Sequence, residues 1–542
     1  MRKILLSLTA VLLSLTASAQ WTDSYEQAVR ALGPGNADSF YEKLTFTTSK
    51  GDTYVLTVRP NGLDDFGRTR LDYRMQILDA NGHLVLPEGG QSVCNYANRS
   101  YLVVNTTGYV DNDNNFLVIA HDARNAASDS DDLSYTVHKF NAKGESLWEP
   151  VMLWDGESFE GSAGINVTQT TDGGYVFTWL SFSMTEENAP IKVHIEKVSK
   201  EGKSVWKRTL SDTKKSYGYP YVQECGDNEV MLVYLYGSNQ TVYAQKLTAD
   251  GQDSWETPVK VYQGGFDQIP IWTHLKVEKA PDGVFINWRD DRNYEDVFSG
   301  YISYIKKDGT YGFPNTYNAL KVSYASEYSR MEPHIVVDEA HQCLYAIYRQ
   351  YSQAYQSYKG IFMQKIGFDG DLKWGPEGVA VVPIQNYVDL GYFSVQMAGD
   401  NEVAAFWQQN DGNVTTSYYQ KFTAEGEPVF DENICFAPTE TVKTDLCSSR
   451  LLEGKYWVMS WLDYCDTQAT DTKKQAAIYL NRLNVDGTMG GLSEGIHQLP
   501  ATSLDADAPV EIYDTDGRRV PALGSKGVYL VKRGQQVQKV IR

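Results

Sequence analysis

The sequence predicts an all-β fold, an eight-bladed β-propeller of four-stranded antiparallel blades. One observation is a turn motif, such as KLTADGQDSW at residues 246–255, which recurs eight times around a glycine. A second is the spacing of these glycines, 49 to 62 residues, which suits one four-stranded sheet with its loops. A third is the alternating, β-branched runs upstream of each glycine, which are typical of strands.

The motif predicts a hairpin turn followed by a large side chain. The eight glycines, which would supply the positive φ of a tight turn, are Gly82, Gly144, Gly202, Gly251, Gly309, Gly370, Gly426 and Gly487. Four residues later comes a ring able to fill the wedge between neighbouring sheets: Trp148, Trp206, Trp255 and Trp374, with Phe313 and Phe430 in weaker copies. The first and last copies have Leu86 and Gly491 there instead. Seven blades plus a separate end module is therefore the alternative.

A column of aromatic residues is expected on the second strand of successive units. It comprises His121, Trp179, Tyr234, Trp288, Tyr348, Trp407 and Trp461. We interpret this column as interior packing between blades, because large rings at one repeated strand position fill the space between sheets.

The amino terminus has the pattern of a signal peptide at residues 1–19. Arg2 and Lys3 precede an apolar run and a small-residue cleavage site at Ala17–Ala19. We expect a mature chain from Gln20, a protein secreted or held at the cell surface after periplasmic transit, and no transmembrane segment. An N-terminal segment, 20–39, would follow, in which SYEQAVRAL suggests a short helix before the ring.

We expect the propeller to span residues 40–498, followed by a linker at 499–508 and a small β module at 509–542. The module contains VEIYDTDGRRV (510–520), GVYLVKRG (527–534) and a final KVIR. These phrases resemble the carboxy-terminal sorting domain of proteins exported by the type IX secretion system, and the body resembles exported bacterial propellers with a glycine–tryptophan turn. The resemblance implies a Gram-negative source and the export machinery as a partner. A plain β appendage is the alternative.

Charge and cysteine content exclude some partners. The formal charge of −20 becomes −22 when Arg2 and Lys3 leave with the signal peptide, and such an acidic surface disfavours nucleic acid. Six cysteines in 542 residues are too few for a disulfide scaffold. One bridge among Cys435, Cys447 and Cys465 and buried free thiols are both compatible with the sequence.

The candidate ligand face is where second strands end and first strands begin, because loops of several blades converge there. The candidate ligand-binding residues are Arg289, Asp290, Arg330, Glu332, His334, Arg349, Gln350, Gln408 and Asp463. Planar amide, carboxylate and guanidinium groups suit the hydroxyls of a glycan; an ordinary solvated rim has the same composition. An acid pair for glycoside hydrolysis would have to come from Asp290, Asp291, Glu332 and Asp463.

No cofactor is expected. Calcium is possible at DNDNN (111–115) or SDSDD (128–132), although the first lacks the glycine and distant glutamate of a calcium loop, and polar hairpin turns are favoured. The chain has no Gly-x-Ser-x-Gly, His-Glu-x-x-His or phosphate-cradling glycine motif. We therefore expect a non-catalytic propeller that binds a glycan or a protein. The alternatives are a carbohydrate-active hydrolase or lyase on the same scaffold, and a structural subunit of a surface assembly.

Overall fold

The structure is a computed structural model. It describes residues 21–35, 42–65, 67, 69–97, 107–122, 134–154, 160–183, 186, 188–237, 241–262, 275–290, 298–314, 319–325, 327–329, 333–352, 354–355, 357–386, 389–412, 414–466, 475–491, 510–514, 518–520, 528–533 and 536–541. Every regular element among them is a β-strand, and none of these residues belongs to a helix that could span a membrane. The chain forms two compact units, Met1–Gly490 and Gly491–Arg542.

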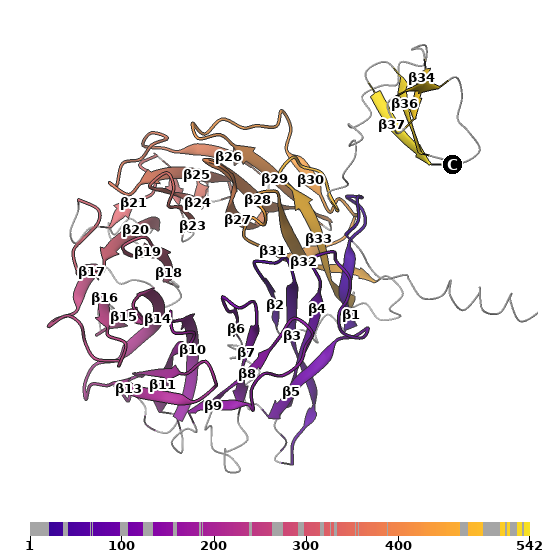
Figure 1. The fold of residues 1–542 in the computed structure, drawn as a ribbon. Helices are drawn as coiled ribbons and strands as arrows, with labels where there is room; N and C mark the ends of the chain where they lie inside the picture. The colour runs from indigo at the N-terminus through magenta and orange to yellow at the C-terminus, as the bar shows by residue number, and fades with distance from the viewer. Residues whose placement is uncertain are drawn as a thin grey trace, which may run out of the picture. The chain divides into compact units, whose positions relative to one another are not determined.

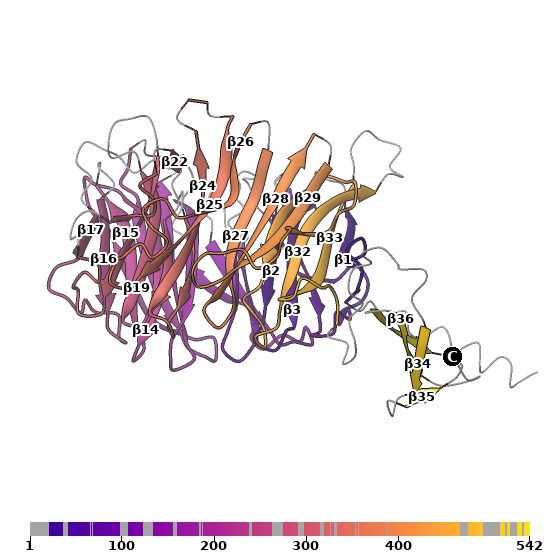
Figure 2. The same ribbon diagram turned by 90° about the horizontal axis from the view of Figure 1, so that it is seen from above.

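The first unit is a ring of eight antiparallel sheets, which confirms the eight-bladed β-propeller and excludes seven blades (Figures 1 and 2). Blade 1 consists of β2 (Glu42–Thr47), β3 (Thr53–Leu63), β4 (Thr69–Leu78) and β5 (Gln91–Ala97). Blade 2 consists of β6 (Thr107–Val110), β7 (Phe116–Asp122), β8 (Ser134–Phe140) and β9 (Val151–Trp154). Blade 3 consists of β10 (Glu160–Gln169), β11 (Tyr175–Ser183), β12 (Lys192–Val198) and β13 (Ser204–Leu210). Blade 4 consists of β14 (Tyr217–Gly226), β15 (Glu229–Tyr236), β16 (Thr241–Leu247) and β17 (Val259–Tyr262).

The remaining blades repeat this order. Blade 5 consists of β18 (Lys276–Ala280), β19 (Gly283–Asp290), β20 (Ser299–Lys306) and β21 (Leu320–Lys321). Blade 6 has its first strand broken into β22 (Tyr328–Ser329) and β23 (His334–Asp338), followed by β24 (Cys343–Tyr351), β25 (Lys359–Gly367) and β26 (Val379–Gln385). Blade 7 consists of β27 (Asp389–Gly399), β28 (Glu402–Asp411), β29 (Val414–Phe422) and β30 (Ile434–Phe436). Blade 8 consists of β31 (Lys443–Ser448), β32 (Tyr456–Asp466), β33 (Gln475–Asn484) and β1 (Val29–Gly35).

The two ends of the propeller meet in blade 8, because β1 pairs antiparallel with β33. The helix expected in SYEQAVRAL is therefore wrong: Val29–Leu32 are strand, and Val29, Ala31 and Leu32 are buried in the core of this blade. Pairing with an otherwise open sheet edge outweighs the local preference for helix. The ring thus begins before residue 40, where the sequence placed its start.

The tryptophan of each turn motif contacts the next blade. The Trp206 indole donates to Ala249 O at 3.0 Å, and a Cβ on Gly251, whose φ is +81°, would come within 2.8 Å of the Trp206 ring. Equivalent indole bonds run from Trp148 to Lys200 O, from Trp255 to Lys307 O and from Trp374 to Ala424 O. Each acceptor lies two residues before a turn glycine. The motif therefore joins blades as well as turning the chain.

Trp21 takes this place where the last motif has Gly491. Its indole donates to Ala80 O at 2.8 Å, and its ring lies against Gly82 of blade 1. Asn481 of β33 accepts from Thr22 N at 3.2 Å and donates to Thr22 O at 3.1 Å. The amino terminus thus completes the eighth repeat. In the first repeat, Leu86 lies against Gly144 in the same manner.

The second-strand column is confirmed as interior packing. Trp288 and Tyr348 are fully buried, and the other members are buried as well. Clusters of buried residues fill the space between neighbouring sheets; one of them joins Ile119 of blade 2 to Trp179 of blade 3. Cys94, Cys225, Cys343, Cys435 and Cys447 form no disulfide bond with one another, while the side chain of Cys465 lies outside the described residues.

A buried polar side chain six residues before the turn glycine supports the fourth strand. In blade 6, Gln364 donates to Gly375 O at 2.7 Å and accepts from Trp374 N at 3.1 Å. Blade 3 has Glu196 at this position, and its side chain is buried. Burial raises the pKa of Glu196, although the Lys207 ammonium lies 3.4 Å away. Blade 3 therefore contains a carboxylate that folding removes from water.

Glu196→Gln is expected to stabilise the folded protein by about 1 kcal/mol at neutral pH. Because the pKa of Glu196 is higher in the folded state than its ordinary value of 4.5, the charged form is destabilising, and this cost disappears as the pH falls below 4.5. Urea unfolding at pH 7 and pH 4 measures both effects. Gln245→Glu, the same position in blade 4, is the reverse control and should destabilise at pH 7. If Glu196→Gln raised the free energy of unfolding by the same amount at pH 7 and pH 4, this explanation would be contradicted.

The second unit is a separate small sheet, which confirms the predicted carboxy-terminal β module. Its strands are β34 (Val510–Asp514), β35 (Arg519–Val520), β36 (Val528–Arg533) and β37 (Gln536–Ile541), in the order β35-β34-β36-β37. The segment VEIYDTDGRRV contains β34 and β35, GVYLVKRG contains β36, and KVIR lies at the end of β37.

Candidate ligand-binding site

Three of the predicted site residues meet at the junction of blades 6 and 7. The His334 ring and the Arg349 guanidinium both lie against Phe393 of β27, at 5.1 and 5.4 Å. Arg349 donates to Leu390 O at 2.5 Å and Gly391 O at 2.7 Å, and Gln408 lies beside Gly391. Burial, with the nearby Lys276 and Arg349 charges, lowers the pKa of His334 to about 3. This cluster joins two blades, and its Arg349 is engaged by backbone carbonyls.

The other predicted residues are separate from this cluster or are engaged locally. Arg289 of blade 5 lies over the Phe298 ring at 5.3 Å, and Asp290 accepts from the Trp288 indole at 2.8 Å. Gln350 is buried with its Oε1 lacking a partner among the described residues, and Asp463 lies in blade 8. Arg330 and Glu332 lie outside the described residues. The nine residues therefore form no common pocket in the described part of the chain.

The proposed acid pair is not assembled either. Asp290 and Asp463 lie on the second strands of blades 5 and 8, three positions apart around the ring. Asp291 and Glu332 lie outside the described residues. A pair of carboxylates acting on one glycosidic bond needs both groups within about 5 to 10 Å. Asp290 and Asp463 belong to blades that are not neighbours, so they do not form such a pair.

A cavity of about 590 Å³ lies between blades 8, 1 and 2. Its lining comes from the ends of the first strands β2, β6 and β31 and the turns after them: Thr45, Phe46, Thr47, Ser49, Gly108, Tyr109, Val110, Asp111, Asn112, Ser448, Ser449 and Arg450. Because neighbouring strands are antiparallel, first strands end where second strands begin. This cavity is therefore at the opposite end of the blades from the face that the sequence predicted, and none of the nine predicted residues lines it.

The cavity presents mainly hydroxyl groups, two rings, one amide and one guanidinium. Thr45 shares a 2.8 Å hydrogen bond with Ser460 of blade 8, and Ser49 donates to Asn114 Oδ1 of blade 2 at 2.6 Å. These bonds fix the walls across two blade junctions. Asn112 and Arg450 are exposed at the rim. The rings of Phe46 and Tyr109 are half-buried and give the lining apolar surface.

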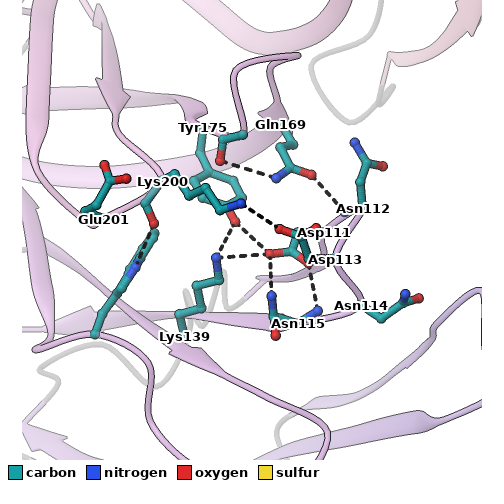
Figure 3. A network of polar contacts seen from close by, with 12 residues as sticks. Asp111, Asn112, Asp113, Asn114, Asn115, Lys139, Gln169, Tyr175, Lys200 and Glu201 are labelled. Carbon is teal, nitrogen blue, oxygen red and sulfur yellow. Dashed lines mark hydrogen bonds and ion pairs between the residues drawn. The ribbon is translucent and has the colours of Figure 1, made fainter.

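The carboxylate in the lining, Asp111, is already engaged (Figure 3). Its Oδ2 lies 3.1 Å from the Lys139 ammonium and accepts from the Tyr175 hydroxyl at 2.8 Å, while its Oδ1 accepts from Asn115 N at 2.7 Å. Burial raises the pKa of this group, but the hydrogen bonds and Lys139 outweigh burial and hold the pKa below its ordinary value. Asp111 is thus an anion at neutral pH and unsuited to act as a general acid.

The same arrangement recurs around the ring, which explains both DNDNN and the lysine of the turn motif. Equivalent ion pairs are Lys197–Asp172, Lys246–Glu229 and Lys421–Glu402. Asn112 N also donates to Gln169 Oε1 of blade 3 at 2.8 Å (Figure 3). The described residues contain no cluster of three or more His, Cys, Asp or Glu able to hold a metal. Asp111 O accepts from Asn114 N at 2.9 Å and Asp111 Oδ1 accepts from Asn115 N at 2.7 Å, so residues 111–115 form a hairpin turn. SDSDD lies outside the described residues.

The sequence contains a signal for this cavity in the turns that follow the first strands, not at the second-strand ends. The turns after the first strands of blades 1, 2 and 8 read TSKG, DNDNN and SSRL, and together they are rich in hydroxyl and amide groups. Such turns also occur at the solvated ends of ordinary blades. Only the fold shows that these three lie around one cavity.

No protein-family model matches the chain, and no curated protein matches it. Among solved structures, an α-L-arabinanase from Penicillium chrysogenum is similar at 13% identity and a TM-score of 0.32, over 60% of this chain and 94% of that one. A polysaccharide lyase is similar at 10% identity and a TM-score of 0.38, over 87% and 98%. Prolyl oligopeptidase B from Galerina marginata is similar at 11% identity and a TM-score of 0.40, over 81% and 56%. Likeness at this level assigns no activity to the chain.

Proposed function

We propose that the protein is an exported binding propeller that holds a saccharide in the cavity between blades 8, 1 and 2. The observation that carries the proposal is the cavity itself. Its volume of about 590 Å³ is within the range of small-ligand sites, about 300–1,000 Å³. Its hydroxyl, amide and guanidinium groups match the donors and acceptors of sugar hydroxyls, and its half-buried rings offer apolar contact to a sugar face.

Binding without turnover is favoured over hydrolysis at this cavity. Of the lining residues only Asp111 has a carboxylate, and its oxygens accept from Tyr175 and Asn115 and pair with Lys139. Glycoside hydrolysis in its common form needs a second carboxyl group, one of the two being protonated. The hydrolase alternative therefore needs a second carboxyl group that this lining lacks.

Export is part of the proposal. The signal-peptide pattern of residues 1–19 and the similarity of the carboxy-terminal module to type IX sorting domains support a protein that is released or held at the cell surface of a Gram-negative bacterium. The separate sheet β34–β37 is compatible with a module recognised by export machinery. Deleting residues 509–542 in the producing cell should leave the propeller in the periplasm if this assignment is correct.

An immobilised panel of oligosaccharides tests the binding function. We expect the purified mature chain to be retained on at least one saccharide, without new reducing ends or unsaturated products in the eluate. Retention of none would reject the proposal, and product formation would favour the hydrolase or lyase alternative. A stable complex recovered from the native envelope, with no saccharide retained, would favour the structural-subunit alternative.

A further inference from the structure

The cavity between blades 8, 1 and 2 has two polar side chains that no described residue engages, Asn112 and Arg450. The bond that Asn112 makes comes from its backbone N–H, which donates to Gln169 Oε1 at 2.8 Å. The bond that Arg450 makes is to its backbone carbonyl, which accepts from the Ser449 hydroxyl at 2.7 Å. Both side chains are exposed at the rim. Among the described residues, the amide and the guanidinium are therefore left for a ligand.

The hydroxyl groups of the same lining are already engaged. Each bonds to another group of the propeller: Thr45 to Ser460, Thr47 to Thr53, Ser49 to Asn114, Ser448 to Ser394, Ser449 to the Arg450 carbonyl, and Tyr109 to Gln169 N. A hydroxyl can make more than one bond, so these groups can still contact a sugar. Being uncharged, however, they do not distinguish an acidic sugar from a neutral one.

The acids in and beside the lining are neutralised by lysines. Asp111 Oδ2 lies 3.1 Å from Lys139 Nζ, and Asp113 Oδ2, next to Asn112 in the chain, lies 3.2 Å from Lys200 Nζ (Figure 3). Opposite charges this close cancel most of the field that either one exerts farther away. Neither carboxylate is therefore a strong obstacle to an anion in the cavity.

The arginine of the lining is not neutralised in this way. Arg450 has no acid within ion-pair distance among the described residues. Glu453, three residues later, lies near Arg482, where its charge opposes the lowering of the Arg482 pKa by burial. Lys50, exposed on the turn of blade 1, is offset by Asp52 two residues later. The lining thus has an excess positive charge on a chain whose net charge is −20.

We propose that the saccharide bound in this cavity is acidic and that the carboxylate of a uronic acid binds Arg450. This inference rests on the proposed function, because it names the class of saccharide that the same cavity takes. A guanidinium presents N–H donors in a plane that matches both oxygens of a carboxylate. The Asn112 amide, at the same rim, donates to and accepts from neighbouring sugar hydroxyls. A neutral sugar would gain nothing from the Arg450 charge.

Paired oligosaccharides that differ in their carboxylates test the inference. Oligomers of galacturonate, glucuronate and mannuronate are titrated against the intact mature chain, alongside carboxyl-reduced forms in which each carboxylate is a hydroxymethyl group. We expect at least one acidic oligomer to bind about tenfold or more tightly than its reduced form. Arg450→Gln should bring this ratio of affinities close to one. Arg450→Lys, which keeps the charge but loses the planar fork, should give an intermediate ratio.

The matched control is Arg70→Gln. Arg70 is exposed on β4 of blade 1 and does not line the cavity, and its substitution removes the same charge from the chain. This variant should keep the wild-type ratio of affinities. Urea unfolding of Arg450→Gln is expected to match the wild type, since no described residue bonds to the guanidinium. If Arg450→Gln does not fold, the ratio measured with Arg450→Lys decides.

Equal affinities for the acidic and reduced forms would overturn this inference and leave the proposed saccharide function in place. A preference for the acidic form that persists in Arg450→Gln, or that Arg70→Gln loses to the same extent, would overturn it as well, because the charge of Arg450 would then not be the cause. If no oligosaccharide binds, acidic or neutral, the proposed function itself is rejected, and this inference with it.

Discussion

Deleting residues 20–35 from the mature chain is expected to prevent the propeller from folding to a stable monomer. The deletion removes β1, leaves the edge of β33 open, and exposes the surface now covered by Trp21, Val29 and Leu32. Loss of a buried tryptophan alone costs about 3–5 kcal/mol. A whole domain is stable by only about 5–15 kcal/mol. Size-exclusion chromatography and circular dichroism of the refolded chain measure the effect.

Point variants at Trp21 separate ring closure from the mere loss of a strand. Trp21→Ala should destabilise the protein by about 3–5 kcal/mol. Trp21→Phe keeps an aromatic ring and loses the bond to Ala80 O, for an expected cost of about 1 kcal/mol. A deletion variant that unfolds at the wild-type urea concentration would show that the amino terminus does not close the ring.

Asn112→Trp is expected to abolish saccharide retention while leaving folding unchanged. Asn112 is exposed at the rim of the cavity between blades 8, 1 and 2, and its backbone N–H, which the substitution keeps, donates to Gln169. An indole there would occupy the entrance. We expect affinity to fall by at least about 100-fold, or about 2.8 kcal/mol. Titration of the retained oligosaccharide against both proteins measures the loss.

The control for this variant is Gln252→Trp. Gln252 is exposed in the turn between β16 and β17, at the same end of the blades, and it does not line the cavity. The control makes the same change from an amide to an indole and should bind as the wild type does. Equal affinities for Asn112→Trp, Gln252→Trp and wild type would show that the saccharide does not bind in this cavity.

Much of the fold is predictable from the sequence because each repeat has the same kind of turn residue and the same kind of packing residue. The turn glycines and the rings four residues later lie where the motif places them, and Trp206 shows why both are needed. Ring closure was not predictable in the same way. The segment from Ser24 to Leu32 has a local pattern compatible with helix, and only the open edge of β33, more than 400 residues away, makes it a strand.

The candidate site was less predictable than the fold. Second-strand ends supplied polar residues of suitable chemistry, but residues such as Arg349 are used to join blades, and Asp290 is engaged by Trp288. Whether a polar side chain is available to a ligand depends on its neighbours in the fold: Leu390, which binds Arg349, lies in the adjacent blade 41 residues away, whereas Trp288, which binds Asp290, is on the same strand. Composition at strand ends cannot distinguish a side chain that binds a ligand from one that is bonded to other residues of the propeller.

Hydrogen–deuterium exchange of the mature chain, with and without a retained oligosaccharide, tests the location of the ligand site most directly. We expect new protection in the turns lining the cavity, residues 108–114 and 448–450, since their backbone lies against the ligand. Protection confined to the second-strand ends around 349–352 and 408–411, with none at these two turns, would contradict the proposed site.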